Sequence, residues 1–349
     1  MSYGFVFPGQ GSQHVGMGKD LYSQFPLARE TFEEADDALG FALSRLCFEG
    51  PADQLMLTAN SQPAILTTSI AILRIVQAET SLQPSLVAGH SLGEYSALVC
   101  ANAVSFEDAV RAVNKRGQFM QEAVPVGEGT MAAVMALTAE EVNQLCKEVA
   151  QGEVLVAANY NSPEQTVIAG QTAAVDRAVA LALERNALAE KLPVSAPFHC
   201  PLMQPAADQL RKVLEQITWR DPEVPVVCNV DGRPITDAGR IVELLVSQVT
   251  SPVRWIDCVR RMVDDGVTEF IEIGFGQTLS RLIRYINRSV ESSCIGTVEE
   301  IRARTGAAAS AADDAGEVFD DGRQVMPDGR IVWPDGMVWD PNEPGAHGF

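Results

Sequence analysis

The sequence lacks the features that would place it in a membrane or in an oxidising compartment. It contains no run of the roughly 20 apolar residues that a membrane span needs, and its N-terminus shows no basic stretch followed by an apolar signal core. The seven cysteines are scattered and form no Cys-x-x-Cys pair, which argues against both a disulfide framework and a structural zinc site. We therefore expect a cytoplasmic protein with free thiols and no bound metal.

Positive charge is also scarce. The chain has 26 lysines and arginines against 46 aspartates and glutamates, which gives a formal net charge of −20. A field of this sign repels phosphate, so we expect neither a nucleic-acid partner nor binding to an anionic membrane. The 349 residues, 46% of them hydrophobic, suffice for the core of a globular enzyme, and we expect a monomer.

Two predicted strands run into glycine-rich turns. The first, residues 4–7, is followed by Pro8-Gly9-Gln10-Gly11, where glycines let backbone amides approach a ligand closely. The second, residues 86–88, leads through Gly89-His90-Ser91-Leu92-Gly93 into a helix of small residues. Gly-x-Ser-x-Gly between a strand and a helix is typical of a nucleophile elbow, although a plain tight turn remains the alternative. The candidate nucleophile is therefore Ser91.

Histidine is rare enough that a general base can be sought by elimination among positions 14, 90, 199 and 347. His14 lies in the glycine-rich loop, His90 should point away from the neighbouring serine, and His347 lies near the chain end. His199, in a segment flanked by prolines, remains as the candidate base, with a purely structural histidine as the alternative. No acid that could orient it is identifiable, and a carbonyl could take that place.

Two polar residues fall on the apolar faces of predicted helices. Arg116 belongs to a helix that begins with a capping box formed by Ser105 and Asp108, and it shares its face with Ala109, Val113 and Met120. A buried arginine needs an anion, which would be either a substrate carboxylate or the partner in an internal salt bridge. Gln248 lies on the apolar stripe of a helix near residue 241, where a hydrogen-bonded core glutamine is the alternative reading.

The spacing of apolar residues predicts an α/β fold with an α/β-hydrolase-like core. Residues 130–194 alternate as β-α-β-β-α-β, which indicates a ferredoxin-like subdomain inserted in that core. We therefore expect a discontinuous catalytic domain at 1–126 and 197–304 and a subdomain at 127–196. Residues 305–349 form an acidic Asp-Gly/Pro repeat of seven-residue period, which we expect to be mobile, with a packed hairpin or docking element as the alternative.

Five motifs in order resemble the malonyl-CoA:acyl-carrier-protein transacylase family, from residue 5 to about residue 300. They are Phe7-Pro8-Gly9-Gln10-Gly11-Ser12-Gln13, Gly89-His90-Ser91-Leu92-Gly93-Glu94, Lys115-Arg116-Gly117-Gln118-Phe119-Met120-Gln121, Asn159-Tyr160-Asn161-Ser162-Pro163 and the His199 segment. The chain departs from the family at Phe275 and Gln277, where proline and lysine are commoner, and in the appendage.

The resemblance implies transfer of malonyl from malonyl-CoA to the phosphopantetheine thiol of acyl carrier protein, by a ping-pong mechanism through malonyl-Ser91 and without a cofactor. The product would supply fatty-acid or polyketide synthesis. By this resemblance, Ser91 and His199 would be catalytic, and the backbone amides of Gln10 and Leu92 would form the oxyanion hole. Arg116 would bind the substrate carboxylate, and the carbonyl of Gln248 would orient the base. The pocket residues would be His90, Asn161 and Phe198. A serine thioesterase or hydrolase using the same Ser-His pair is the alternative, and a silent carrier-binding module is a second.

An acidic enzyme that receives an acidic carrier protein needs a local basic surface. Three arginines recur at i, i+3 and i+7 opposite the apolar side of a predicted helix: Arg281, Arg284 and Arg288. This pattern predicts a carrier-docking face, with an ordinary solvated helix face as the alternative.

Overall fold

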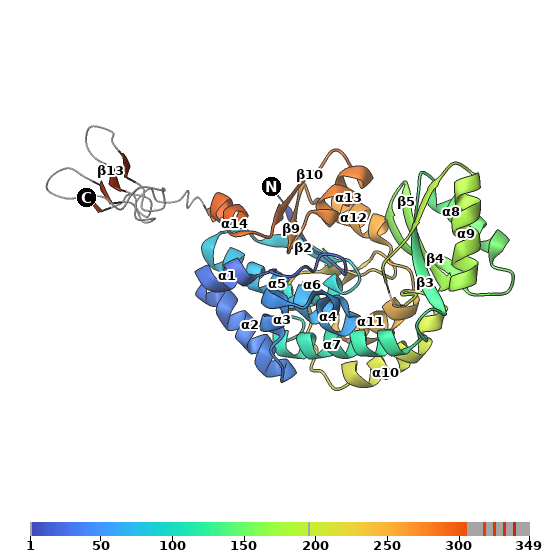
Figure 1. Cartoon of the computed structure of the whole chain (residues 1–349), viewed down its shortest axis with the longest axis horizontal. Helices are drawn as coiled ribbons and strands as arrows, with labels where there is room; N and C mark the ends of the chain where they lie inside the picture. The colour runs from blue at the N-terminus through green and yellow to red at the C-terminus, as the bar shows by residue number, and fades with distance from the viewer. Residues whose placement is uncertain are drawn as a thin grey trace. The chain divides into compact units, whose positions relative to one another are not determined.

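The computed structural model describes residues 2–194 and 196–305 and four two-residue strands beyond them. The chain forms two compact units, Met1–Val298 and Glu299–Phe349, each taken by itself below (Figure 1). No helix in the described residues is long and apolar enough to cross a membrane.

A six-stranded sheet in the order β10-β9-β1-β2-β7-β8 forms the centre of the first unit. Its strands are β1 (Tyr3–Phe7), β2 (Pro84–Gly89), β7 (Val226–Val227), β8 (Pro234–Ile235), β9 (Glu269–Ile273) and β10 (Glu291–Ile295). All neighbours pair in parallel except β7 and β8, which are antiparallel. Because the parallel strands run the same way, the loops after β1, β2, β7 and β9 leave one edge of the sheet together.

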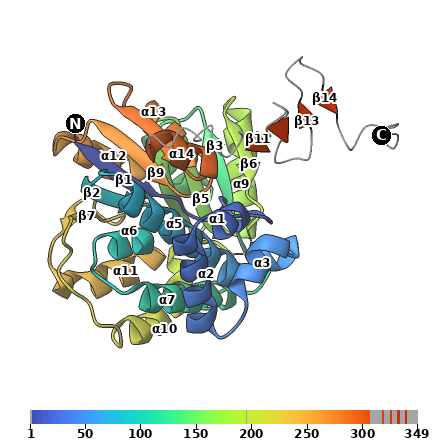
Figure 2. The ribbon, with the colours of Figure 1, turned by 90° about the vertical axis from the view of Figure 1, so that its left-hand side faces the viewer.

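Helices cover both faces of this sheet (Figure 2). Val6, Leu86 and Ala88 pack with buried residues of α12 (Trp255–Asp264) and α13 (Thr278–Ile286). Because side chains alternate along a strand, the intervening ones, such as Phe5, point to the opposite face of the sheet. On that face α6 (Gly93–Cys100) contacts β1 and β2, and α5 (Thr58–Glu79) contacts β9. Apolar residues occur on several sides of α5, and the helix is buried along most of its length.

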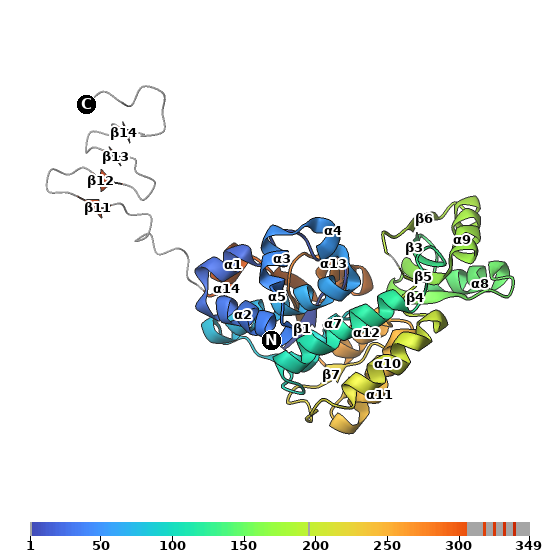
Figure 3. The same cartoon turned by 60° about the horizontal axis from the view of Figure 1, so that its bottom comes forward.

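Further helices surround α5. The helices α2 (Pro26–Leu39) and α7 (Phe106–Glu122) pack against it, and α10 (Gln204–Leu214) joins α7 to α11 (Ile241–Thr250), as Figure 3 shows. The shorter helices of this unit are α1 (Lys19–Gln24), α3 (Leu43–Glu49) and α4 (Ala52–Met56), while α14 (Val298–Thr305) begins at the unit boundary. Half of the capping box predicted for α7 is present: the Ser105 hydroxyl accepts from the amide of Asp108 at 3.1 Å, but it also donates to the Asp108 carboxylate at 2.8 Å in place of the reciprocal bond from the Ser105 amide.

A second, antiparallel sheet is formed by residues between α7 and α10, at the right of Figure 1. Its elements follow the order β3 (Gly129–Met135), α8 (Ala139–Val149), β4 (Leu155–Ser162), β5 (Gln165–Gln171), α9 (Thr172–Glu184) and β6 (Leu188–Lys191). The strands lie in the order β4-β5-β3-β6, and α8 and α9 pack together on them through one apolar cluster. The last strand ends at Lys191, so the alternation predicted through residue 194 is wrong for residues 192–194.

The edge strand β4 joins the small sheet to the larger part of the unit. The amide of Val253, just after α11, donates to the carbonyl of Ala158 at 2.8 Å, and its carbonyl accepts from the amide of Tyr160 at 2.9 Å. This bridge pairs Val253 with Asn159 in parallel. One side of the small sheet is therefore fixed to the segment that follows Gln248.

The second unit contains four short strands in an antiparallel meander: Glu317–Val318 (β11), Gln324–Val325 (β12), Ile331–Val332 (β13) and Val338–Trp339 (β14). They begin seven residues apart, so each repeat of the sequence adds one strand. The pairing of Gln324 with Val332 and of Ile331 with Trp339 keeps the same register. The mobility predicted for 305–349 concerns residues that, apart from these strands, lie outside the described part of the chain.

The turn after β2 depends on a glycine. A Cβ atom at Gly89 would lie 1.9 Å from the carbonyl carbon and oxygen of Gly93, which are backbone atoms and cannot move aside. We expect Gly89→Ala to lower the free energy of unfolding by about 3 kcal/mol, measured by urea denaturation. Gly239→Ala is the control, since its nearest neighbour is the Asp237 side chain at 3.2 Å. Equal losses in the two variants would contradict this explanation.

Candidate active site

Three loops at the carboxyl edge of the large sheet bring polar residues together. Gln10 follows β1, Ser91 follows β2 and Asn229 follows β7. Ser91 has a φ of +52°, in the left-handed region that L-residues rarely adopt, and Leu92 is the N-cap of α6. The strand, the strained turn and the helix are those of a nucleophile elbow.

The hydroxyl of Ser91 contacts the imidazole of His199. Ser91 Oγ lies 2.7 Å from His199 Nε2, and the Arg116 guanidinium donates to the same oxygen at 3.2 Å. His199 Nδ1 lies 2.8 Å from the main-chain carbonyl of Gln248, which can only accept. The proton therefore resides on Nδ1, and Nε2 accepts from the serine, so the pair is arranged for proton transfer from Oγ to Nε2.

Burial keeps this histidine neutral. His199 is 3% exposed, and burial together with the nearby Arg116 charge lowers its pKa to about 3, although the Gln248 carbonyl opposes the shift. An uncharged imidazole at neutral pH is the form able to accept a proton. No carboxylate contacts its ring in the described residues, where the carbonyl of Gln248 occupies the usual place of the acid.

Arg116 is the largest polar side chain in the core, with 1% exposure. Its guanidinium donates to Gln62 Oε1 and to Gln248 Oε1, each at 2.9 Å. No carboxylate lies within salt-bridge distance of it in the part of the chain that the structure describes, so the internal salt bridge left open by the sequence is absent there. Burial lowers its pKa. A guanidinium bonded only to neutral oxygens is suited to receive an external anion.

A cavity of about 230 Å³ opens onto these groups. Its walls come from both sheets of the first unit and include Gln10, His90, Met131, Leu192 and Phe198 as well as the serine, histidine and arginine already described. Residues 192–194, which follow β6, form part of this wall.

The predicted pocket residues His90 and Asn161 contact each other. His90 Nε2 lies 2.9 Å from Asn161 Oδ1, and its ring packs on Trp255 at 5.7 Å between centroids. His90 lines the cavity as well, whereas the asparagine of this motif that lines it is Asn159. Burial lowers the pKa of His90. Both residues support the wall beside Ser91.

Two residues that the sequence did not single out for a role complete the environment of the serine. Asn229 Oδ1 accepts from the amide of Ser91 at 2.7 Å, and its Nδ2 donates to the carbonyl of Gly89 at 2.7 Å. The buried carboxylate of Glu94 accepts from the amide of Asn229 and from Gln248 Nε2, both at 2.9 Å. A signal existed for Glu94, since it directly follows the Gly-x-Ser-x-Gly turn.

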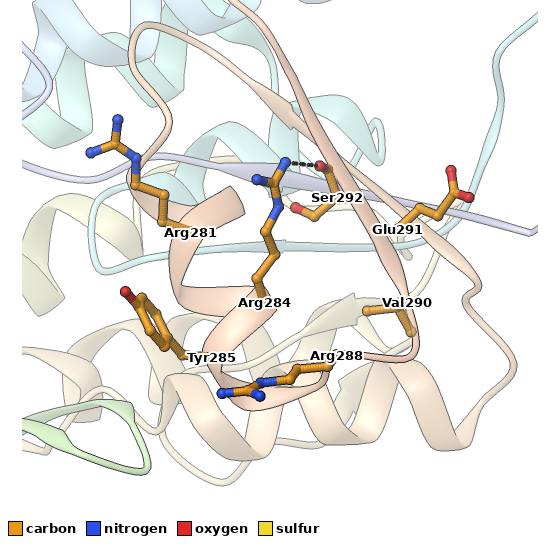
Figure 4. Close-up of a pocket in the computed structure, with 7 residues that line it drawn as sticks. All are labelled: Arg281, Arg284, Tyr285, Arg288, Val290, Glu291 and Ser292. Atoms are coloured by element: carbon orange, nitrogen blue, oxygen red, sulfur yellow. Dashed lines mark hydrogen bonds between the residues drawn. The ribbon is translucent and has the colours of Figure 1, made fainter.

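The three arginines predicted as a docking face line one depression of about 680 Å³ (Figure 4). Arg281 and Arg284 belong to α13, but the helix ends at Ile286, so the prediction that Arg288 shares its helical spacing is wrong. Arg288 instead lies in the turn before β10. None of the three arginines forms a salt bridge with another described residue, and Tyr285 among them is 68% exposed.

Nothing in the described residues suggests a metal centre. No group of three or more His, Cys, Asp or Glu side chains there could hold an ion. Cys200, next to the base, is buried, and its thiol contacts the carbonyl of Pro197 at 3.0 Å. Burial raises its pKa to about 11, which disfavours a thiolate and leaves Ser91 as the nucleophile that the geometry presents.

Comparison with known proteins places this geometry among acyl transferases. Residues 4–308 match the family model of the acyl transferase domain. The malonyl CoA-acyl carrier protein transacylase of Bacillus subtilis (strain 168) is 48% identical over 299 residues, covering 85% of this chain and 94% of that protein. The protein of the same name from Escherichia coli (strain K12) is 47% identical over 294 residues, covering 84% and 95%.

Solved structures agree with the sequence relatives. The malonyl CoA-acyl carrier protein transacylase of Coxiella burnetii has a TM-score of 0.86 at 46% identity, covering 88% of this chain and 97% of that one. A malonyl-transacylase in complex with its type II polyketide synthase acyl-carrier protein has a TM-score of 0.86 at 44% identity, covering 88% and 99%.

The hydrogen bonds of Asn229 predict a local effect on the nucleophile. Asn229→Ala leaves a buried amide and a buried carbonyl without partners, so we expect it to cost about 2–4 kcal/mol of stability and to slow labelling of Ser91 by a fluorophosphonate at least tenfold. Asn114→Ala is the matched control, because Asn114 is buried and donates to the carbonyl of Ala59 at 2.8 Å away from the turn. Its labelling rate should match wild type, and unchanged labelling in both variants would refute the role of Asn229.

Proposed function

The chain belongs to the acyl transferase family that includes the malonyl CoA-acyl carrier protein transacylases, and we propose that it transfers malonyl from malonyl-CoA to the phosphopantetheine thiol of an acyl carrier protein. The observation that carries this proposal is the buried Arg116, which has no anionic partner among the described residues and donates to the oxygen of Ser91. A carboxylate bound there would lie beside the nucleophile. Malonyl has such a carboxylate, one methylene away from its thioester carbonyl.

In the first half-reaction Ser91 Oγ gives its proton to His199 Nε2 and attacks the malonyl thioester carbonyl. The tetrahedral intermediate collapses, the C–S bond breaks, and CoA leaves as a thiol with the proton from His199. Backbone amides of Gln10 and Leu92 bind the oxyanion, and the position of Leu92 at the N-terminus of α6 adds the positive end of the helix dipole.

The second half-reaction reverses the same steps with another thiol. The carrier's phosphopantetheine thiol gives its proton to His199 and attacks the malonyl ester, and Ser91 leaves with that proton. The carbonyl of Gln248 keeps the imidazole in the required tautomer throughout. Phe198, His90 and Asn161 shape the wall of the acyl pocket. No cofactor takes part in this scheme.

We also propose a domain architecture. We assign an α/β-hydrolase-like catalytic domain to residues 1–126 and 197–304 and a ferredoxin-like subdomain to residues 127–196. The nucleophile elbow at the edge of a largely parallel sheet supports the first assignment, and the strand order β4-β5-β3-β6 supports the second. The substrate cavity then lies where the two parts meet.

The arginine depression provides a surface for the carrier. Arg281, Arg284 and Arg288 form no salt bridge with a described residue, in a chain whose net charge is −20, and α13 lies against β4, the strand that contributes Asn159 to the cavity. An acidic carrier docked on this surface would stand near the acyl pocket, as its phosphopantetheine arm requires.

The first test is a mass measurement. Incubation with malonyl-CoA should give a malonyl adduct that is absent in Ser91→Ala, while Arg116→Ala should lower kcat/KM for malonyl-CoA about 100-fold and keep or improve acetyl transfer. Acetyl-CoA is the matched substrate because it lacks only the carboxylate. Equal loss for both substrates would make the arginine structural, and rapid release of free malonate without an acceptor would instead indicate a hydrolase.

The second test concerns the carrier. Reversing Arg281, Arg284 and Arg288 to Glu should raise the KM for acyl carrier protein about tenfold and leave acylation by malonyl-CoA unchanged, because the three side chains do not line the acyl pocket. Reversal of three other exposed arginines that likewise form no salt bridge with a described residue, Arg220, Arg233 and Arg260, is the control of equal net charge. A carrier KM that is the same in the two triple variants would refute the docking surface.

A further inference from the structure

Glu94 is a buried carboxylate for which the proposed reaction has no use. It lies in the first turn of α6, is fully buried, and shares complete burial with only one other carboxylate in the described residues, Glu272. Glu272 has a local structural task, since it accepts from the amides of Leu279 and Ser280 at the start of α13. Glu94 instead contacts Asn229 and Gln248, whose side chains both hydrogen-bond to the backbone of Ser91.

The bonds of Glu94 determine how the Gln248 amide is oriented. A carboxylate can only accept, so its bond to Gln248 at 2.9 Å requires the NH₂ group of that amide to face Glu94. Gln248 Nε2 donates to the carbonyl of Ser91 as well, at 3.0 Å. The amide oxygen is thereby turned toward Arg116, from which it accepts at 2.9 Å. A flipped amide would direct NH₂ at the guanidinium and lose this bond.

We propose that Glu94 is a positioning residue for recognition of the acyl carboxylate, acting through Gln248 to hold the Arg116 guanidinium beside Ser91. This inference rests on the proposed role of Arg116 as the malonyl-binding group. Glu94 does not contact the guanidinium at salt-bridge distance, so a substrate carboxylate does not have to displace it. The site thus has a nearby negative charge that offsets the buried arginine while its donor groups stay accessible to the substrate.

The charges around Glu94 give this arrangement a pH dependence. Burial raises its pKa to about 7, against the bonds from Asn229 and Gln248 and the charge of Arg116, which lower it. The other titratable groups facing it are Tyr95, Cys228 and Cys258, whose pKa values are all raised by burial, so they stay neutral near pH 7. His199 and His90 have lowered pKa values and are also neutral there.

The sign of the effect follows from the raised pKa. Above about pH 7 the Glu94 carboxylate is ionised and holds the amide of Gln248, while below it the group takes up a proton, can itself donate, and no longer fixes that amide. We expect the KM of the wild-type enzyme for malonyl-CoA to rise as the pH falls through 7. In Glu94→Gln, whose side chain at position 94 does not titrate, this rise of the KM for malonyl-CoA at low pH should be absent.

The decisive experiment is a double-mutant cycle on acylation by malonyl-CoA. Glu94→Gln should raise KM about tenfold with kcat changed less than threefold, and in an Arg116→Ala background the same change should alter kcat/KM less than twofold. Glu272→Gln is the matched control, which removes a buried carboxylate elsewhere and should lower the melting temperature without changing KM for malonyl-CoA.

Each outcome decides between the two proposals. Independent tenfold losses in both backgrounds, or an equal fall of kcat and stability in Glu94→Gln and Glu272→Gln, would show that Glu94 is merely structural. An unchanged KM in Glu94→Gln with a normal response of Arg116→Ala would overturn this inference alone. If Arg116→Ala fails to discriminate malonyl from acetyl, the proposed function itself fails.

Discussion

The hydrogen bonds of Gln248 join the separate parts of the active site. Its carbonyl accepts from the base, its amide oxygen accepts from Arg116, and its amide nitrogen donates to Glu94 and to the carbonyl of Ser91. The nucleophile, the base and the guanidinium come from three different parts of the chain, and one residue on α11 relates them through its side chain and its main-chain carbonyl. The bridge between Val253 and β4 follows directly after this helix. The strand that contributes Asn159 to the cavity wall is therefore held next to the helix that carries Gln248.

This arrangement pairs most of its polar groups in a closed interior, while Glu94 Oε1 and Arg116 Nε have no hydrogen-bond partner among the described residues. A buried guanidinium with only neutral partners would be unfavourable in isolation, and the nearby carboxylate of Glu94 reduces that penalty without occupying the donor groups. Asn229 performs a related task for the backbone, satisfying an amide and a carbonyl that the strained turn at Ser91 would otherwise leave unpaired. Reactivity and stability therefore depend on the same network.

Much of the site could be predicted from the sequence where a local pattern carries the information. The turn at Ser91 follows from glycine spacing, and the face of Arg116 follows from the apolar period of its helix. Asn229 had no such pattern, because its partners are about 140 positions earlier in the chain and only the pairing of β2 with β7 brings them near. Arg288 was placed on a helix that ends before it, since periodicity does not reveal where Asn287 leaves helical geometry.

The contact between Arg116 and Ser91 bears on how substrates are distinguished. Ser91 Oγ accepts a hydrogen bond from the Arg116 guanidinium, which withdraws electron density from the lone pairs that must attack. In the proposed reaction, an acyl group with a carboxylate would engage that N–H and release the oxygen, whereas an acyl group without one would leave the bond in place. Discrimination would then act on the reactivity of the serine, because only a substrate with a carboxylate would free the attacking oxygen.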